Sequence, residues 1–260
     1  MRKRKKVSYF IKPLNNALDL LEQFNGEKDE LGVTELSQRL NLHKNNVFRL
    51  LATLETGGYI EQNMATENYR LGLKSIELRQ AFIKNLGFVR PARPFLKEIV
   101  EKCNETAYVG TIRQNFAICV DVEEANQIVR VANRIGRRIP IHCTAIGKAQ
   151  IAYATEEELE KLGILNHMER FTPHTIVNGA EFLKHIREVA KRGYAVDNEE
   201  YHVGLRCVGV PVRDYSGRVV GGISVSGPSY RMTDEVLKET IIPIVTGAGE
   251  KVSKRLGFGA

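Results

Sequence analysis

The segment GVTELSQRLNLHKNNVFRLLATLETGGYI, residues 32–60, decides the fold of this 260-residue chain. Leu36 and Leu40 are one helical turn apart, and after a break at residues 41–43 the apolar side chains recur with the spacing of a second helix. Those side chains are Val47, Leu50, Leu51 and Leu54. The pattern predicts two short helices that cross at a tight turn and bury one apolar stripe each.

The face of the second predicted helix that is left free is polar. Its side chains can donate hydrogen bonds to phosphates and, in some cases, to base edges. The candidates for DNA binding on this face are Lys44, Asn45, Asn46, Arg49 and Thr53. This chemistry is typical of a recognition helix. An ordinary helical hairpin with a solvated face has the same spacing, so the motif alone leaves both interpretations open.

Short elements on either side complete a winged helix-turn-helix domain. The apolar spacing over residues 9–24 predicts a helix that closes a three-helix core. A short strand near Ile60, a polar tip at residues 63–68 and a returning strand at residues 69–71 would form the wing. The wing carries two glutamates against Arg70 alone, so we expect this DNA-binding candidate to add little affinity.

Positive charge is concentrated in the first third of the chain. Residues 1–97 hold 17 Lys and Arg against 10 Asp and Glu, whereas residues 98–260 hold 21 of each, so the formal charge of +7 arises entirely before residue 98. This division is typical of a polyanion-binding domain joined to a neutral sensing domain. The densest cluster, RKRKK at residues 2–6, is either a solubilising tail or a basic arm that follows the DNA backbone.

Composition argues against several other classes of protein. No apolar run approaches the ~20 residues of a membrane-spanning helix, and the basic start is not followed by the apolar stretch and cleavage site of a signal peptide. We therefore expect a cytoplasmic protein without a membrane partner. The four cysteines are widely spaced and include no Cys-x-x-Cys pair, which favours reduced thiols over structural zinc. No metal and no cofactor are expected.

Three segments are expected along the chain: the winged domain at residues 1–72, a linker helix at 73–90 and a sensor domain at 91–260. The linker carries more apolar residues than a solvated helix tolerates, so some of them must pack on a partner chain or on the next domain. Pro94 is expected in the first turn of the helix that follows, because proline fits that position.

Residues beyond 104 mix strands and helices. Short connections between the strands imply antiparallel neighbours. The expected strands are residues 106–113, 116–123, 128–133, 194–198, 205–213 and 218–226. Helices are expected at 144–154, after Thr155, at 178–192 and from Thr233. The second helix has the spacing of a capping box in Thr155 and Glu158, and the third has it in Asn178 and Glu181. The fold class is α+β, with an antiparallel sheet surrounded by helices.

Three blocks in this half carry a family resemblance: IPIHCTAIGKA at residues 139–149, KRGYAVDNEEYHVGLRCVGVPV at 191–212 and GGISVSGPSYR at 221–231. Together with the helix-turn-helix, they make the chain resemble the IclR family of bacterial transcriptional regulators nearly end to end. The resemblance implies a winged helix-turn-helix domain, a dimerising linker helix and a GAF-like effector-binding domain. It also implies a homodimer or homotetramer on a palindromic double-stranded DNA operator, and a small effector, often an organic acid, that changes the affinity for DNA.

The resemblance also assigns an effector pocket. Its positions in this chain are Ala145, Ile146, Asp197, Leu205, Cys207, Ser224 and Ser226, with Ile128, Val131 and Ile139 as an apolar wall. Backbone N–H groups at the start of a helix favour an anion, and two serines that alternate on one strand face add hydroxyl donors. A solvent-facing strand edge for the serines and a packed core thiol for the cysteine are the plainer alternatives.

The chain departs from the family pattern at two places. Asn45 and Asn46 stand where members usually have Ser or Thr before the aromatic and the arginine, here Phe48 and Arg49, and Phe48 is carried over with them as a DNA-binding candidate. Asparagine hydrogen-bonds adenine bidentately and serine does not, which puts the operator sequence in question. Ala145 and Ile146 also make the pocket loop bulkier than in members with glycine there, so we expect a ligand of different size or shape.

Two other classes of function remain as alternatives. A thiol-dependent enzyme would use Cys143 beside His142, but neighbours in an extended segment point to opposite sides and no third orienting group is identified. Asp197, Glu199 and Glu200 form a metal cluster or, more simply, a solvated strand end. The other class is a DNA-binding protein that ignores metabolites and keeps a vestigial sensor domain.

Overall fold

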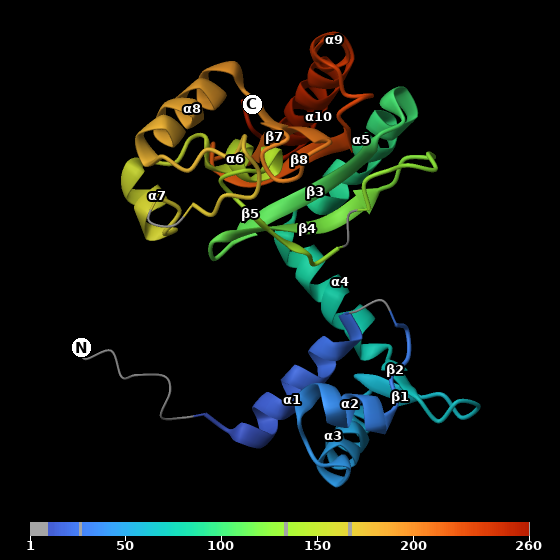
Figure 1. Cartoon of the computed structure of the whole chain (residues 1–260). Helices are drawn as coiled ribbons and strands as arrows, with labels where there is room; N and C mark the ends of the chain where they lie inside the picture. The colour runs from blue at the N-terminus through green and yellow to red at the C-terminus, as the bar shows by residue number, and fades with distance from the viewer. Residues whose placement is uncertain (1–9, 26–27, 133–134, 166–167, 260) are drawn as a thin grey trace. The chain divides into compact units, whose positions relative to one another are not determined.

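The computed structural model describes residues 10–25, 28–132, 135–165 and 168–259. They divide into two compact units, with the boundary between Asn85 and Leu86 (Figure 1). The division falls inside the segment expected to be a linker. The basic cluster at residues 2–6 lies outside the described residues.

The first unit is a winged helix-turn-helix domain. Its elements are α1 Lys12–Glu22, a 3-10 turn Gln23–Asn25, α2 Val33–Leu40, α3 Lys44–Thr56, β1 Ile60–Gln62, β2 Tyr69–Leu71 and α4 Lys74–Leu86. The apolar stripes predicted from spacing form its core, in which the side chains of Leu20, Leu36, Val47 and Leu51 are fully buried. The three-helix core is therefore confirmed.

The turn between α2 and α3 is held by local bonds. Asn41 adopts the left-handed conformation, with φ of 51°, and so ends α2. The Ser37 hydroxyl donates to the Leu42 carbonyl at 2.5 Å, and the Leu42 amide donates back to the Ser37 carbonyl at 3.0 Å. These bonds fix the direction in which α3 leaves the turn.

The wing is a two-stranded antiparallel hairpin in which Ile60 pairs with Leu71 and Gln62 with Tyr69. A bridge from Leu31 to Tyr69 joins it to the segment before α2. At its base, a Cβ on Gly72 would lie 2.3 Å from the Gly58 carbonyl oxygen, so this close approach requires glycine.

The second unit contains a six-stranded antiparallel sheet in the order β5-β4-β3-β8-β7-β6. The strands are β3 Thr106–Arg113, β4 Phe116–Glu123, β5 Arg138–Pro140, β6 Ala195–Asn198, β7 Leu205–Arg213 and β8 Val219–Pro228. Five of the six strands expected from the sequence are present, and three of them, β3, β4 and β7, have the expected bounds.

Helices lie on both faces of this sheet (Figure 1). Helices α5 Val89–Cys103 and α10 Ile242–Arg255 share one face, and the other carries α6 Ala145–Ile151, with α7 Glu156–Lys161 and α8 Gly179–Arg192 beyond it. The short α9 Asp234–Val236 and a π-helical turn, Leu237–Ile241, precede α10. The expected caps are present, because Thr155 and Glu158 form a capping box and the Asn178 side chain accepts from the Glu181 amide.

Glycines set the distance between α6 and the sheet. A Cβ on Gly209 would lie 2.6 Å from the Ala145 carbonyl carbon, and a Cβ on Gly110 would lie 2.7 Å from the Ile146 Cδ1 atom. Because these strand positions lack a side chain, α6 sits directly on β3, β7 and β8.

Two expectations about this unit are wrong. The β-branched segment 128–133 was expected to be a strand, but residues 128–132 have no strand structure, and the edge position beside β4 is taken by β5. The Ile128 side chain is 100% exposed, so no burial supports its strand propensity. Pro94 lies inside α5, which begins at Val89, because burial of Phe88, Val89 and Ala92 outweighs the hydrogen bond that the proline removes.

Other features agree with the composition. All four cysteines are free thiols. Within the described ranges, no helix is both long enough and apolar enough to cross a lipid bilayer.

Candidate DNA-binding and effector-binding sites

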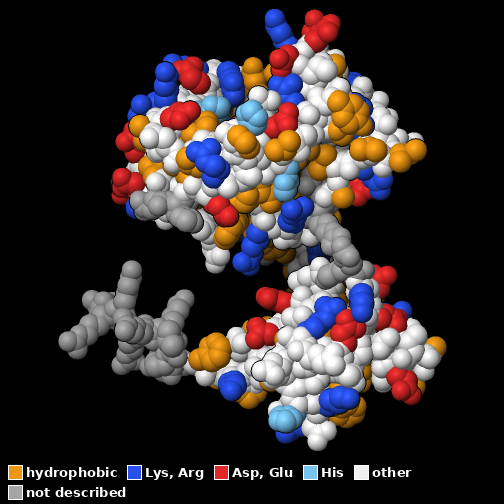
Figure 2. Space-filling view, in the orientation of Figure 1, with side chains coloured by type: hydrophobic (Ala, Val, Ile, Leu, Met, Phe, Trp, Pro, Cys, Tyr) orange, Lys and Arg blue, Asp and Glu red, His pale blue; other side chains and the backbone are white. Residues whose placement is uncertain are grey.

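Helix α3 presents two different faces. Val47 and Leu51 are fully buried in the core of the first unit, whereas the DNA-binding candidates Lys44, Asn45, Asn46, Phe48, Arg49 and Thr53 are all exposed. In Figure 2, basic side chains and a histidine lie on the lower surface of this unit. The structure therefore brings these six candidates onto one accessible helix.

The start of α3 offers backbone donors as well. His43 occupies the N-cap position but its side chain makes no capping bond, and the first amides bonded there are those of Asn46 and Val47, both to the His43 carbonyl. The Lys44 and Asn45 amides have no acceptor among the described residues. Free amides at a helix N-terminus favour an anion such as a phosphate.

The candidates differ in how free their polar groups are. Arg49 has no ion-pair or hydrogen-bond partner in the described parts of the chain. The Thr53 hydroxyl donates to the Arg49 carbonyl at 2.8 Å, so its proton is already used. Arg70 donates through Nε to Glu61 at 2.7 Å and lies 3.9 Å from Glu30, so its charge is already balanced. Arg49 is therefore better placed than Arg70 to contact a phosphate.

Phe48 is the unusual member of this face. Its side chain is 57% exposed although its neighbours on the surface are polar. An aromatic ring in this position can contact the methyl group of thymine in the major groove.

The effector candidates meet beneath α6. Pairing across β6, β7, β8 and β3 puts Asp197 opposite Cys207, Cys207 opposite Ser226, and Ser226 opposite Thr106. All four are at most 3% exposed. We call this in-register line of side chains the polar row. Ala145 and Ile146 of α6 are also buried, so seven expected positions lie in this region: Ile139, Ala145, Ile146, Asp197, Cys207, Ser224 and Ser226.

Short contacts connect the polar row to its surroundings. The Ser226 hydroxyl lies 3.0 Å from the Cys207 Sγ atom and 3.3 Å from the Tyr108 hydroxyl. Ser224, two residues before Ser226 on β8, donates to the Val208 carbonyl at 2.9 Å. Tyr108 also joins Ile139 and Ile146 in an apolar cluster. The site therefore combines buried hydroxyls and a carboxyl with an apolar wall, as small-molecule sites do.

Burial controls the protonation of Asp197. It raises the pKa of this carboxyl from 3.8 to about 7, and the charge of Glu200 acts in the same direction while Lys148 opposes it. The Asp197 carboxylate accepts from the Glu200 amide at 2.8 Å and from the Tyr201 amide at 3.4 Å. Near neutral pH, a substantial share of the molecules carry a protonated Asp197 that can donate a hydrogen bond.

Two residues near this row were not predicted as part of the site. Lys148 of α6 is fully buried, and its ammonium donates to the Val196 carbonyl at 2.6 Å and to Glu200 at 2.5 Å. Tyr108 was placed in a strand but given no role. The sequence signal for both was weak, because only the strand register and the seating of α6 bring them to the row.

Three expected wall and pocket positions lie differently. Leu205 is only partly buried, at the start of β7. Ile128 is fully exposed and Val131 partly so, in the segment without strand structure. Ile128 and Val131 therefore do not join the buried group here, because the strand that was expected to carry them does not form.

The His142 and Cys143 pair has no catalytic arrangement. The two lie in a turn before α6, and the His142 Nε2 atom bonds the Glu169 carbonyl at 2.9 Å. Burial raises the pKa of the Cys143 thiol and so disfavours the thiolate that a nucleophile requires. Among the described residues, no group of three or more His, Cys, Asp or Glu side chains is placed to hold a metal ion.

A winged helix-turn-helix unit followed by an α+β unit with a buried polar site defines a two-domain DNA-binding regulator. Comparisons with known proteins agree: residues 13–63 match the family described as IclR helix-turn-helix domain, and residues 80–254 match Bacterial transcriptional regulator IclR C-terminal. The chain therefore belongs to the IclR family of bacterial transcriptional regulators.

Individual relatives cover nearly the whole chain. The HTH-type transcriptional regulator KdgR of Escherichia coli (strain K12) is 35% identical over 233 residues, which is 90% of this chain and 88% of that protein. The crystal structure of the Thermotoga maritima IclR has a TM-score of 0.83 at 27% identity and covers 96% of this chain and 100% of that one. An IclR homolog from Microbacterium hydrocarbonoxydans, complexed with 4-hydroxybenzoate, has a TM-score of 0.82 at 19% identity, with 94% and 98% covered.

Proposed function

We propose that this transcriptional regulator binds a palindromic operator through α3 and that a small organic acid, bound at the polar row, changes its affinity for DNA. The observation that carries the effector proposal is the in-register line of Asp197, Cys207 and Ser226, buried under α6 in an otherwise apolar layer. A few aligned polar groups within an apolar layer are typical of small-molecule sites, where they orient the ligand, so this arrangement favours a ligand-binding role.

The chemistry of the row suits an acid. A protonated Asp197 can donate to a carboxylate, and the Tyr108 and Ser226 hydroxyls can donate beside it. The apolar cluster that contains Ile139 and Ile146 would face the rest of the ligand. The Microbacterium homolog carries 4-hydroxybenzoate, an acid of this kind, which supports the ligand class and leaves the identity of the effector open.

The proposed DNA contacts come from α3. Free amides at its start and the unpaired Arg49 would hold the phosphate backbone, and Asn45 and Asn46 would reach base edges. Lys74 pairs with Glu77 at 2.7 Å and is a weaker candidate for a phosphate contact. This division assigns affinity to the cations and sequence preference to the asparagines.

A palindromic operator requires two copies of the chain, and we propose that α4 supplies the contact between them. Several large apolar side chains on or beside this helix are exposed: Leu73, Ile76, Leu78 and Phe82. The two recognition helices of such a dimer must lie about one DNA turn, ~34 Å, apart. An effector would act by changing that separation. Such a protein works in the cytoplasm, where the bacterial chromosome lies.

The test is a DNA-binding titration with and without ligand. We would measure fluorescence anisotropy of the DNA upstream of the chain's own gene, with a panel of small organic acids that includes 4-hydroxybenzoate. For an acid that shifts the affinity, Ser226→Ala and Asp197→Ala should abolish the shift and keep the affinity without ligand. Ser216→Ala, in an exposed turn, is the matched control and should keep the shift.

A second candidate function is DNA binding that no metabolite modulates. The observation in its favour is that Ser224 and Ser226 already have partners within the protein, so the row is satisfied without a ligand. An operator affinity that none of the acids changes, in a protein that melts cooperatively, would favour this candidate.

A further inference from the structure

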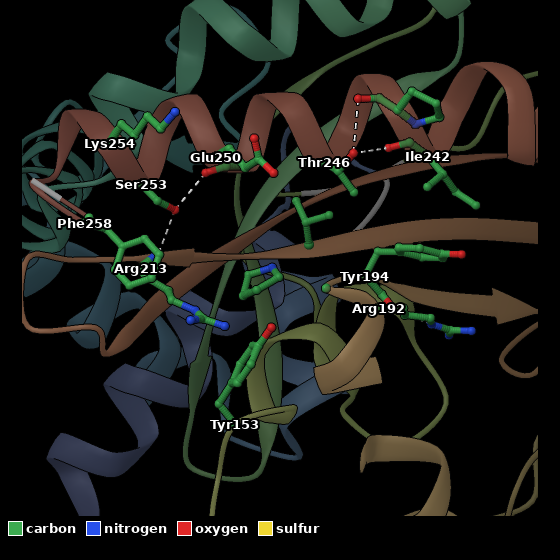
Figure 3. A pocket seen from close by; sticks show the side chains of 16 residues that line it. Tyr153, Arg192, Tyr194, Arg213, Ile242, Thr246, Glu250, Ser253, Lys254 and Phe258 are labelled. Atoms are coloured by element: carbon green, nitrogen blue, oxygen red, sulfur yellow. Dashed lines mark hydrogen bonds between the residues drawn. The ribbon is translucent and has the colours of Figure 1, made fainter. Parts of the chain in front are cut away.

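The second unit has a cleft that is separate from the polar row (Figure 3). Its volume is about 720 Å³, within the range of small-molecule sites. It is lined by the end of β7, one side of α10, Tyr153 after α6, and the residues just before β6. None of the expected effector positions lines it. The cleft therefore requires its own explanation.

The cleft exists because β6 is shorter than β7. Pairing between the two strands stops at Ala195 and Gly209, so residues 210–213 of β7 continue without a strand on that side. Arg192 and Tyr194, which precede β6, do not pair with β7 and form one wall of the cleft (Figure 3). α10 forms the opposite wall.

Arg213 is held in place inside this cleft. Its backbone amide donates to the Ser253 hydroxyl of α10 at 3.0 Å. Its guanidinium lies 3.6 Å from the centre of the Tyr153 ring and 5.0 Å from that of Phe258. The Tyr153 hydroxyl is itself bonded to the Ala190 carbonyl. The guanidinium is thus fixed by stacking, which leaves its N–H donors free.

The charge in the cleft is unbalanced. Arg192, Arg213 and Lys254 line it together with one acid, Glu250, and within the described ranges none of the three cations has a carboxylate partner. Elsewhere in this unit partly buried arginines are paired, as Arg231 is with Glu105 and Arg206 with Asp234. An ordered and partly buried guanidinium without a counter-ion favours an anion.

We propose that this cleft is a second ligand site, which binds a small anion, carboxylate or phosphate, attached to an aromatic or other flat apolar body. Arg213 would form the bidentate contact with the anionic group, and Lys254 and Arg192 would add charge at the rim. The ring of Tyr194, together with Pro211 and Ile242, would contact the apolar body. This site is independent of the effector site proposed above.

Calorimetric titration of the full-length protein with three probes tests this assignment. Benzoate and phenyl phosphate share an aromatic body and differ in the anionic group, and benzamide is the uncharged control. We expect saturable binding of at least one anion and none of benzamide. Arg213→Gln should weaken the binding at least tenfold, and Lys254→Gln severalfold. The guanidinium of Arg255 lies over Phe95, outside the cleft, so the control variant Arg255→Gln should bind like the wild type.

The two proposed sites can be told apart in the same experiment. Asp197→Ala should keep the binding event that Arg213→Gln weakens. Whichever anion binds more tightly identifies the preferred anionic group. Lys254 is exposed, so its variant keeps the test valid if Arg213→Gln proves unstable in thermal melting. Unchanged affinity in both cleft variants, or no saturable binding by the wild type, would overturn the proposal. The proposal would also be overturned if the cleft variants lost self-association and kept probe binding, since that would assign the cleft to contact with a second copy of the chain.

Discussion

At the scale of single residues, the two units use charge in opposite ways. Arg49 on α3 is exposed and unpaired, as a group that contacts phosphate must be. Lys148 of α6 is fully buried and paired with Glu200, so its charge is neutralised within the fold. Asp197, beside that pair, keeps its proton to a higher pH than an exposed aspartate does, because burial raises its pKa to about 7. Position in the fold therefore decides what each of these groups can do.

Replacing Arg49 tests the proposed phosphate contact. Arg49→Ala should weaken operator binding, and the slope of log affinity against log salt concentration should fall by about one unit. Arg70→Ala is the matched control, because Arg70 is already paired with Glu61, and it should change the slope much less. Anisotropy titrations at several salt concentrations measure both. Equal slopes in Arg49→Ala and the wild type would remove this side chain from the interface.

The raised pKa of Asp197 predicts how stability depends on pH. The folded state binds this proton more tightly than the unfolded chain, whose carboxyl titrates near 3.8. The stabilising contribution is therefore full below pH 4 and is lost as the pH rises to about 7, with a slope of up to about 1.4 kcal/mol per pH unit. Burial lowers the pKa of His185 to about 4, so this residue contributes a slope of the opposite sign. The wild type and any variant at Asp197 share that contribution.

Asp197→Asn isolates that contribution, because asparagine keeps the shape and does not titrate. Urea unfolding at pH 5, 6, 7 and 8 should show the variant gaining stability relative to the wild type as the pH rises to 7. The exposed Asp29→Asn is the control and should follow the wild type. A constant difference between Asp197→Asn and the wild type over this range would contradict the assignment.

At the scale of elements, the seating of α6 on the sheet determines the geometry of the polar row. The helix has only seven residues, so its position depends on packing against β3, β7 and β8. Gly110, Gly209 and Gly222 leave the space that it occupies. The row beneath is buried because the helix lies this close.

Gly209→Ala tests this dependence. The new Cβ would lie 2.6 to 2.7 Å from backbone atoms of Ala145, which cannot move as a flexible side chain can. We expect a loss of roughly 1–3 kcal/mol in the free energy of unfolding, typical of overpacking. Gly179→Ala is the control, because it starts α8 with no atom within 4 Å of the added Cβ, and it should be neutral or slightly stabilising. Urea unfolding followed by circular dichroism distinguishes the two.

At the scale of the whole molecule, the proposed function requires two copies of a chain whose units do separate work. The first unit carries the exposed polar helix, and the second carries the buried polar row and the cationic cleft. In the proposed mechanism, the ligand acts on DNA binding by changing how the two copies associate, because a palindromic operator is read by two recognition helices at once.

Phe82→Asp should therefore weaken self-association and, with it, operator binding. The side chain is apolar and 42% exposed on α4, and a charge there cannot be buried against a partner without a large cost. Gln80→Asp introduces the same charge at an exposed polar position of the same helix and is the control. Sedimentation velocity gives the oligomeric state. If the Phe82→Asp variant associated as fully as the wild type, the contact between copies would lie elsewhere than at Phe82 of α4.

The sequence by itself determined the elements whose periodicity is strong. Apolar spacing gave the helix-turn-helix, capping residues gave the start of α7 and α8, and alternation gave β3, β4 and β7, because these patterns depend on neighbours within one helical turn or one hairpin. It also determined the class of protein, since the helix face and the family blocks are local features.

Only the tertiary structure decided what depends on distant contacts. The strand expected at 128–133 does not form in its described part, because β5 occupies that edge, and α5 begins before Pro94 because its first turn is buried. The polar row joins residues up to 120 positions apart in the chain, Thr106 and Ser226, through pairing of four strands. Register and helix seating are set by the packing of the whole unit, and no local pattern encodes them.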